Sequence, residues 1–156
     1  MIKKLIEKYG EKLCVGAGTV FDSETARHAI LHGAQFIIAP NYTKDVAEIC
    51  NRYQIPYAPG CTSFTEAVDS LSAGAAFIKA FPISDFYGSK LVSVFKTPIP
   101  EMPILASGGM NVDNIEIWLK NGVDVCGIGS LLTKGTVEEI TENAKSIRAI
   151  ITKYRK

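Results

Sequence analysis

The stretch Ala73-Gly74-Ala75-Ala76-Phe77-Ile78-Lys79 decides how this chain folds. Its glycine follows a helical pattern, and a glycine in that place supplies the left-handed residue that stops a helix. The apolar run after the glycine continues to Pro82, and such a run, bounded by Gly and Pro, is typical of a strand covered on both faces. The phrase therefore predicts a helix end followed at once by a buried strand.

The same phrase occurs twice more, at Gly33-Ala34-Gln35-Phe36-Ile37 and at Gly122-Val123-Asp124-Val125-Cys126. Successive copies lie two strand–helix units apart, and units of about twenty to twenty-four residues suit a compact (β/α) barrel. Helical and strand patterns alternate along the whole chain, which predicts an α/β fold with parallel strands. No linker divides residues 1–156, so we expect a single domain. The predicted helices cover 2–9, 23–32, 43–53, 64–73, 88–96, 112–121 and 136–153, and the predicted strands cover Leu13–Gly16, Gln35–Ala39, Pro56–Ala58, Ala76–Ala80, Ile104–Ala106 and Val123–Ile128.

Composition excludes several classes of function. The 156 residues are 47% hydrophobic with a net charge of +1, which indicates an ordinary globular chain without the basic surface of a nucleic-acid-binding protein. No apolar run is long enough to cross a membrane, and residues 1–10 lack the features of a signal peptide. We therefore expect a cytoplasmic protein.

The four cysteines are scattered, without a C-x-x-C pair, so the sequence predicts neither a zinc site nor a redox motif. Cys14 and Cys126 lie in apolar strand-like runs, where free thiols behave as small core residues. All four cysteines are expected to be free in a reducing compartment.

Lys79 is the candidate nucleophile, because the predicted strand around it is otherwise apolar. Desolvation disfavours the ammonium form, so a buried amine loses its proton nearer neutral pH. A neutral amine at the end of a strand is what Schiff-base formation with a carbonyl substrate requires. The structural alternative is a lysine that extends its ammonium group from the strand end to water.

Glycine and polar residues collect where the predicted strands end, which is the edge that holds the active site in parallel α/β proteins. The last two of these loops, Ser107-Gly108-Gly109 and Gly129-Ser130, fit a phosphate site, since glycines let an anion approach the backbone closely. The alternative is that these are turn glycines and that Ser130 caps a helix.

Several other polar residues have two readings. Thr19 either binds a substrate carboxylate or caps the helix near Ser23, with Asp22 the better cap. His28 and His32 have a metal-binding spacing but no third ligand nearby, so we expect them to face solvent and predict no metal. Glu24 and Glu66 are interpreted as helix-start residues.

Taken in order, the motifs resemble those of the 2-keto-3-deoxy-6-phosphogluconate / 4-hydroxy-2-oxoglutarate aldolase family. The resemblance covers nearly the whole chain, and the family has Thr where Ser107 stands. The matching phrases are Gly16-Ala17-Gly18-Thr19-Val20, Gly33-Ala34-Gln35-Phe36-Ile37, Pro59-Gly60, Thr65-Glu66, Lys79-Ala80-Phe81-Pro82, Ser107-Gly108-Gly109 and Gly127-Ile128-Gly129-Ser130.

The resemblance implies a class I aldolase of the (β/α)8 TIM-barrel type that uses no cofactor and no metal. Lys79 would form a Schiff base with a 2-oxo acid, which cleaves to pyruvate and an aldehyde, either glyceraldehyde 3-phosphate or glyoxylate. Thr19 and Gly16 would contact the pyruvate end, while Pro40 and Phe81 would pack around the imine. A distal phosphate would be held by Ser107, Gly108, Gly109, Gly129 and Ser130. A homotrimer is implied by the resemblance alone.

The chain also departs from the family pattern. Its six predicted strands correspond to family strands three to eight, so the barrel is expected to be incomplete, without the first two strand–helix units. The family places its acid/base glutamate on the second strand, and no residue here matches it. We therefore expect weak or no turnover. Alternatives are cleavage of 2-dehydro-3-deoxy-6-phosphogalactonate, or a catalytically impaired remnant that binds phosphate ligands.

Overall fold

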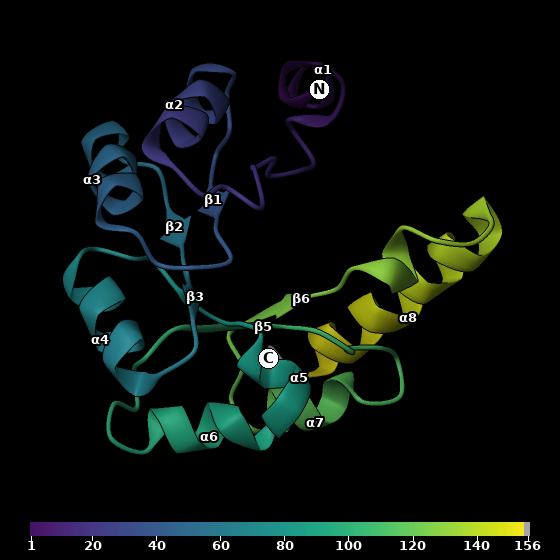
Figure 1. The fold of residues 1–156 in the computed structure, drawn as a ribbon. Helices are drawn as coiled ribbons and strands as arrows, with labels where there is room; N and C mark the ends of the chain where they lie inside the picture. The colour runs from purple at the N-terminus through teal and green to yellow at the C-terminus, as the bar shows by residue number, and fades with distance from the viewer. Residues whose placement is uncertain (155–156) are drawn as a thin grey trace. The chain divides into compact units, whose positions relative to one another are not determined.

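The computed structural model describes residues 1–154 and divides the chain into two compact units, Met1–Lys79 and Ala80–Lys156. Each unit alternates helices with short parallel strands (Figure 1), which confirms the predicted α/β class. Among residues 1–154, no helix is both long and apolar enough to cross a membrane.

The first unit contains four helices and four short strands, and its helices α2 and α3 pack against each other (Figure 1). Its predicted helices all form within about a residue of their expected bounds. The elements are α1 (Ile2–Tyr9), α2 (Ser23–Leu31), β1 (Ile37–Ile38), α3 (Lys44–Tyr53), β2 (Tyr57–Ala58), β3 (Gly60–Cys61), α4 (Phe64–Ser72) and β4 (Ile78–Ala80).

Parallel pairing in this unit follows the chain order. β1 pairs with β2, with Ile37 opposite Tyr57 and Ile38 opposite Ala58. The backbone N–H of Lys79 on β4 donates to the carbonyl of Pro59, at 2.8 Å. Each strand therefore ends beside the strand that precedes it, as a crossover fold requires.

The predicted first strand, Leu13–Gly16, is not a strand. Only an isolated bridge forms, one residue later, between Ala17 and Ile37. Val15 is bonded to Gln35 without forming a regular ladder: its backbone N–H donates to the side-chain oxygen of Gln35 at 2.7 Å, and its carbonyl accepts the Gln35 backbone N–H at 2.8 Å. Cys14 is exposed, and its predicted place in the core is wrong.

The helix ends follow the capping signals in the sequence. Gly33, Gly74 and Gly122 have φ angles of +93°, +87° and +88°, which confirms that they supply the left-handed residue after a helix. Asp22 caps α2, accepting the backbone N–H of Thr25 at 2.6 Å, as predicted.

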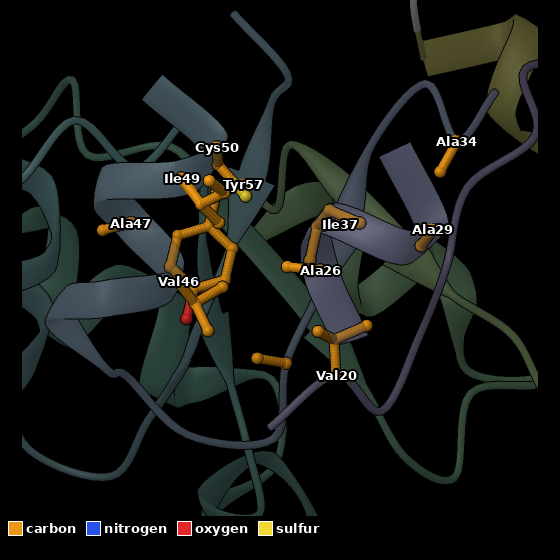
Figure 2. Close-up of a cluster of buried hydrophobic side chains, with 11 residues drawn as sticks. Val20, Ala26, Ala29, Ala34, Ile37, Val46, Ala47, Ile49, Cys50 and Tyr57 are labelled. Carbon is orange, nitrogen blue, oxygen red and sulfur yellow. The ribbon is translucent and has the colours of Figure 1, made fainter. Parts of the chain in front are cut away.

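The core of the first unit lies between α2, α3 and the strands β1 and β2 (Figure 2). Ile37 and Tyr57 project from the strands toward buried residues of α2 and α3, among them Ala26 and Val46. Cys50 belongs to this cluster, and Cys61 is also fully buried. These two thiols, rather than Cys14, are the small core residues of the unit, while Cys126 is half-buried.

The second unit pairs β5 with β6 in parallel, with Ser107 opposite Gly127 at the carboxyl end. Its buried side chains include Ile104 of β5 together with Ile115 and Trp118 of α7. The elements are α5 (Ile83–Tyr87), α6 (Lys90–Lys96), β5 (Ile104–Ser107), α7 (Ile115–Lys120), β6 (Val125–Gly127), the 3-10 helix η1 (Ser130–Leu132) and α8 (Val137–Tyr154).

Two helix predictions in this unit need correction. The segment after Pro82 was not among the predicted helices but forms α5, and Gly88, with φ +61°, separates it from α6. The helix predicted for 112–121 begins only at Ile115, because Asn111 and Asn114 hold a turn: the Asn111 side chain accepts the backbone N–H groups of Asp113 and Asn114, at 2.9 and 3.1 Å.

Candidate active site

Lys79 lies in the middle of β4, between two residues that are completely buried, Ile78 and Ala80. The lysine side chain itself is half-buried. Burial lowers the pKa of the Lys79 amine below its ordinary value of 10.5, because desolvation disfavours the ammonium ion. A larger fraction of this amine is therefore neutral and nucleophilic near pH 7 than at an exposed lysine.

Pro40 and Gly60 lie at the strand ends next to Lys79 in the same unit. A methyl carbon added at Gly60 would be 1.9 Å from the carbonyl oxygen of Pro40, so only glycine allows this approach. The residue before Gly60 is Pro59, whose carbonyl accepts the backbone N–H of Lys79. The fold thus brings the predicted residues Pro40 and Lys79 to one edge of the first unit.

Thr19 has a left-handed backbone, with φ +61°, and its side chain is exposed. This conformation costs energy in a residue other than glycine, and such strained residues cluster at functional sites. Since Asp22 is the cap of α2, the alternative role of Thr19 as that cap is wrong. Its role as a substrate ligand stays a prediction.

Gly16 has a packing role that its sequence context did not reveal. An added methyl carbon would lie 2.4 Å from ring atoms of Phe36. Glycine therefore makes room for an aromatic ring at this position, and contact with substrate remains a prediction. Phe81 is partly buried and is joined to Pro82 by a cis peptide bond in the second unit.

The five residues predicted to hold phosphate all lie in the second unit, on the loops after β5 and β6. These two loops start from paired residues, since Ser107 is opposite Gly127. Gly108 and Gly109 have φ angles of +115° and +62°, and the Asn114 side chain donates to the Gly109 carbonyl at 2.8 Å. Gly129 and Ser130 are exposed and open η1. Gly129 is the cap of η1, so Ser130 does not have the alternative role of a cap.

A cavity of about 300 Å³ reaches the Gly108–Gly109 loop within the second unit. It lies between α5, the start of α6 and α7. Among the described residues that line it, Asp85 has the only acidic or basic side chain. Sequence reasoning overlooked Asp85 because the segment after Pro82 carried no pattern that predicted a helix. The lining consists of Ser84, Asp85, Gly88, Ser89, Gly108, Gly109, Asn114, Ile117 and Trp118.

The two glutamates considered from the sequence are helix-start residues, as predicted. Glu66 completes a capping box with Ser63 at the start of α4 and accepts the backbone N–H of Thr62 at 2.6 Å. The hydrogen bonds from Thr62 lower the pKa of Glu66 below its ordinary value of 4.5. Glu24 lies in the first turn of α2.

The two histidines on α2 are exposed, as predicted, with ring centroids 4.2 Å apart. In the part of the chain that the structure describes, no three His, Cys, Asp or Glu side chains gather where they could hold a metal ion.

The class of protein is shown by comparison with known families. The model of the KDPG and KHG aldolases matches residues 1–150. The chain is 32% identical over 155 residues to the 2-dehydro-3-deoxy-6-phosphogalactonate aldolase of Escherichia coli K12, which covers 99% of this chain and 75% of that protein. It is also 32% identical over 114 residues to the 2-dehydro-3-deoxy-phosphogluconate aldolase of Treponema pallidum, covering 72% of this chain and 54% of that protein.

Solved structures agree with this assignment. A structure described as native KDPGal superposes with a TM-score of 0.91 at 29% identity, covering 98% of this chain and 75% of that one. The KDPG aldolase of Legionella pneumophila, with pyruvate captured as a covalent carbinolamine intermediate, gives a TM-score of 0.76 at 27% identity and covers 98% and 71%. The chain therefore belongs to the KDPG and KHG aldolase family and has its TIM-barrel-type α/β fold, and it spans about half to three quarters of the curated relatives it matches.

Proposed function

We propose that this chain carries the Schiff-base half of a class I aldolase, with Lys79 as the nucleophile. The observation that supports this most is the half-buried Lys79 amine of β4, whose pKa is lowered by desolvation. The covalent carbinolamine in the Legionella pneumophila relative is the adduct that an amine forms with the carbonyl of pyruvate. The proposal extends that chemistry to Lys79.

In the proposed reaction, the neutral Lys79 amine attacks C2 of a 2-oxo acid, and the carbinolamine takes up a proton on its hydroxyl and loses water to give a protonated imine. The C3–C4 bond then breaks, its electron pair moves toward the imine nitrogen, and the C4 hydroxyl gives up its proton as the aldehyde leaves. Protonation of the enamine at C3 and addition of water release pyruvate and the free amine. Glu24 and Glu66 are not assigned the proton transfer, because both serve as helix-start residues.

The substrate that we propose is 2-keto-3-deoxy-6-phosphogluconate, with 4-hydroxy-2-oxoglutarate as a further substrate. Thr19 and Gly16 would contact the pyruvate end, and Pro40 and Phe81 would pack around the imine. The glycine loops after β5 and β6 would bind the phosphate through backbone N–H groups. Gly109 is exposed, and no atom lies within 4 Å of a methyl carbon added there.

The galactonate epimer is a second candidate substrate. It is favoured by the relative from Escherichia coli K12, a 2-dehydro-3-deoxy-6-phosphogalactonate aldolase that matches 99% of this chain, against 72% for the gluconate-named relative from Treponema pallidum. Retro-aldol rates with both epimers separate the two candidates, since the epimers differ only in configuration at one carbon.

Trapping with borohydride tests the nucleophile. The chain is incubated with pyruvate, reduced, digested and analysed by mass spectrometry. We expect one reduced pyruvate on Lys79, no adduct in Lys79→Arg, and full labelling in Lys44→Arg, which alters an exposed lysine. Phosphate-ester binding without any adduct would instead support a non-catalytic binder and would contradict the proposal.

A homotrimer and a cytoplasmic location are the remaining parts of the proposed function. The homotrimer rests on the family resemblance, and the location rests on the sequence of residues 1–10 and the lack of a long apolar run. Sedimentation equilibrium of the full chain tests the first. A single species with the mass of one chain would contradict it.

A further inference from the structure

Helix α5 is attached to the end of β5 by a buried hydroxyl. Ser84 is 2% exposed, and its Oγ donates to the carbonyl of Ser107, the last residue of β5. The backbone N–H of Asp85 donates to the carbonyl of Pro82 at 3.0 Å, which forms the first turn of the helix. Helix α5 is accordingly in contact with β5. In Figure 1 the labels of α5 and β5 lie near each other.

The Asp85 carboxylate lies against Gly108. A methyl carbon added to Gly108 would be 1.6 Å from Oδ1 and 2.5 Å from the carboxylate carbon of Asp85. Position 108 therefore requires glycine for two reasons: the Asp85 side chain occupies the place of a Cβ atom, and the backbone is left-handed, with φ +115°. A carboxylate therefore occupies the side of the Gly108 backbone on which a Cβ atom would lie.

The surroundings offer this carboxylate no cationic neighbour in the cavity. The lining residues that the structure describes include Ser89 and Asn114 as polar groups, but neither a lysine nor an arginine. Asp85 is exposed, so its charge is solvated and not held by a buried ion pair. A phosphate bound at Gly108 and Gly109 would have this negative charge as a close neighbour.

We propose that Asp85 is a specificity-determining residue, whose carboxylate weakens phosphate binding at the Gly108–Gly109 loop and thereby narrows the preference for phosphorylated over unphosphorylated 2-oxo acids. The inference rests on the proposed function, in which this loop faces the distal end of the substrate. Two unit charges about 4 Å apart in water change an equilibrium about fivefold. A phosphate carries about 1.5 charges at pH 7. Because the energies add and the factors multiply, removing the carboxylate should tighten phosphate binding about tenfold.

The test is a titration of the full chain with inorganic phosphate, followed through the backbone amide resonances of Gly108 and Gly109. We expect Asp85→Asn to lower the Kd about tenfold relative to the wild type, and high salt to reduce this difference because it screens exposed charges. Asp85→Glu keeps the charge and should retain weak binding. Asp113→Asn is the matched control: it removes an exposed carboxylate of the same unit that does not line the cavity, and should change the Kd less than about twofold.

Asp85→Ser provides a second neutral variant if Asp85→Asn does not fold. Equal Kd values for the wild type and a folded neutral variant would overturn the role of Asp85. Failure of every variant to bind phosphate at this loop would overturn it too, together with the phosphate site of the proposed function. Trapping of pyruvate on Lys79 does not depend on either result, so failure of the aldolase chemistry is recognised separately.

Discussion

Replacing Gly60 by alanine should destabilise the edge of the first unit that carries Lys79. The added methyl carbon would lie 1.9 Å from the Pro40 carbonyl oxygen, 2.2 Å from its carbon and 2.9 Å from the Asn41 nitrogen. All three are backbone atoms, so relief requires the segment Pro40-Asn41, which follows β1, to move away from Gly60 by more than an ångström. Flexible side chains cannot absorb the strain.

The expected magnitude follows from this geometry. Overpacking a buried site costs about 1–3 kcal/mol, and a clash with backbone belongs at the upper end, near 3 kcal/mol. Gly60 is buried, so the methyl group cannot turn toward solvent. With a urea m-value of about 2 kcal/mol/M for a small protein, the midpoint of unfolding should fall by about 1.5 M.

Urea unfolding followed by circular dichroism measures this midpoint. Gly18→Ala is the matched control, because nothing lies within 4 Å of the methyl carbon added there, and its midpoint should stay within about 0.3 M of the wild type. An unchanged midpoint for Gly60→Ala, with an unchanged m-value, would refute the close approach of Pro40 to Gly60.

Three further predictions concern titration and reactivity. Hydrogen bonds hold the pKa of Glu66 below 4.5 in the folded chain, so its contribution to stability is present above pH 4.5 and is lost as the pH falls through the lower folded pKa. In thermal unfolding, Glu66→Gln should therefore lose less stability than the wild type on acidification from pH 5. Parallel curves of stability against pH would contradict this. Burial lowers the pKa of the Lys79 amine, so its rate of competitive acetylation, followed against pH, should have a lower midpoint pH than that of the exposed Lys44. Coincident midpoints would contradict the desolvation of Lys79. Burial raises the pKa of Cys50 and of Cys61 to about 11, whereas Cys14 is exposed. A thiol reagent at pH 8 should therefore label Cys14 first and label the other two only on unfolding. Early labelling of Cys50 would contradict its burial in the core of the first unit.

Local signals in the sequence were sufficient for the helices of the first unit, the left-handed glycines and the buried strand around Lys79. A cap or a stop glycine acts within a few residues, so Asp22 and Gly74 could be read without knowledge of distant contacts. The family motifs added the roles of residues whose local pattern alone left two readings open. The aldolase family itself was therefore recognisable from the sequence.

Tertiary structure decided what depended on partners far along the chain. The side chain of Gln35 accepts the backbone N–H of Val15 inside the predicted first strand, and no property of residues 13–16 discloses this partner. Ser84 of the short α5 bonds to the end of β5, and the Asp85 carboxylate lies against Gly108, two contacts that depend on distant residues. Short segments have weak intrinsic preferences, so packing and hydrogen bonds from elsewhere in the fold determine their conformation.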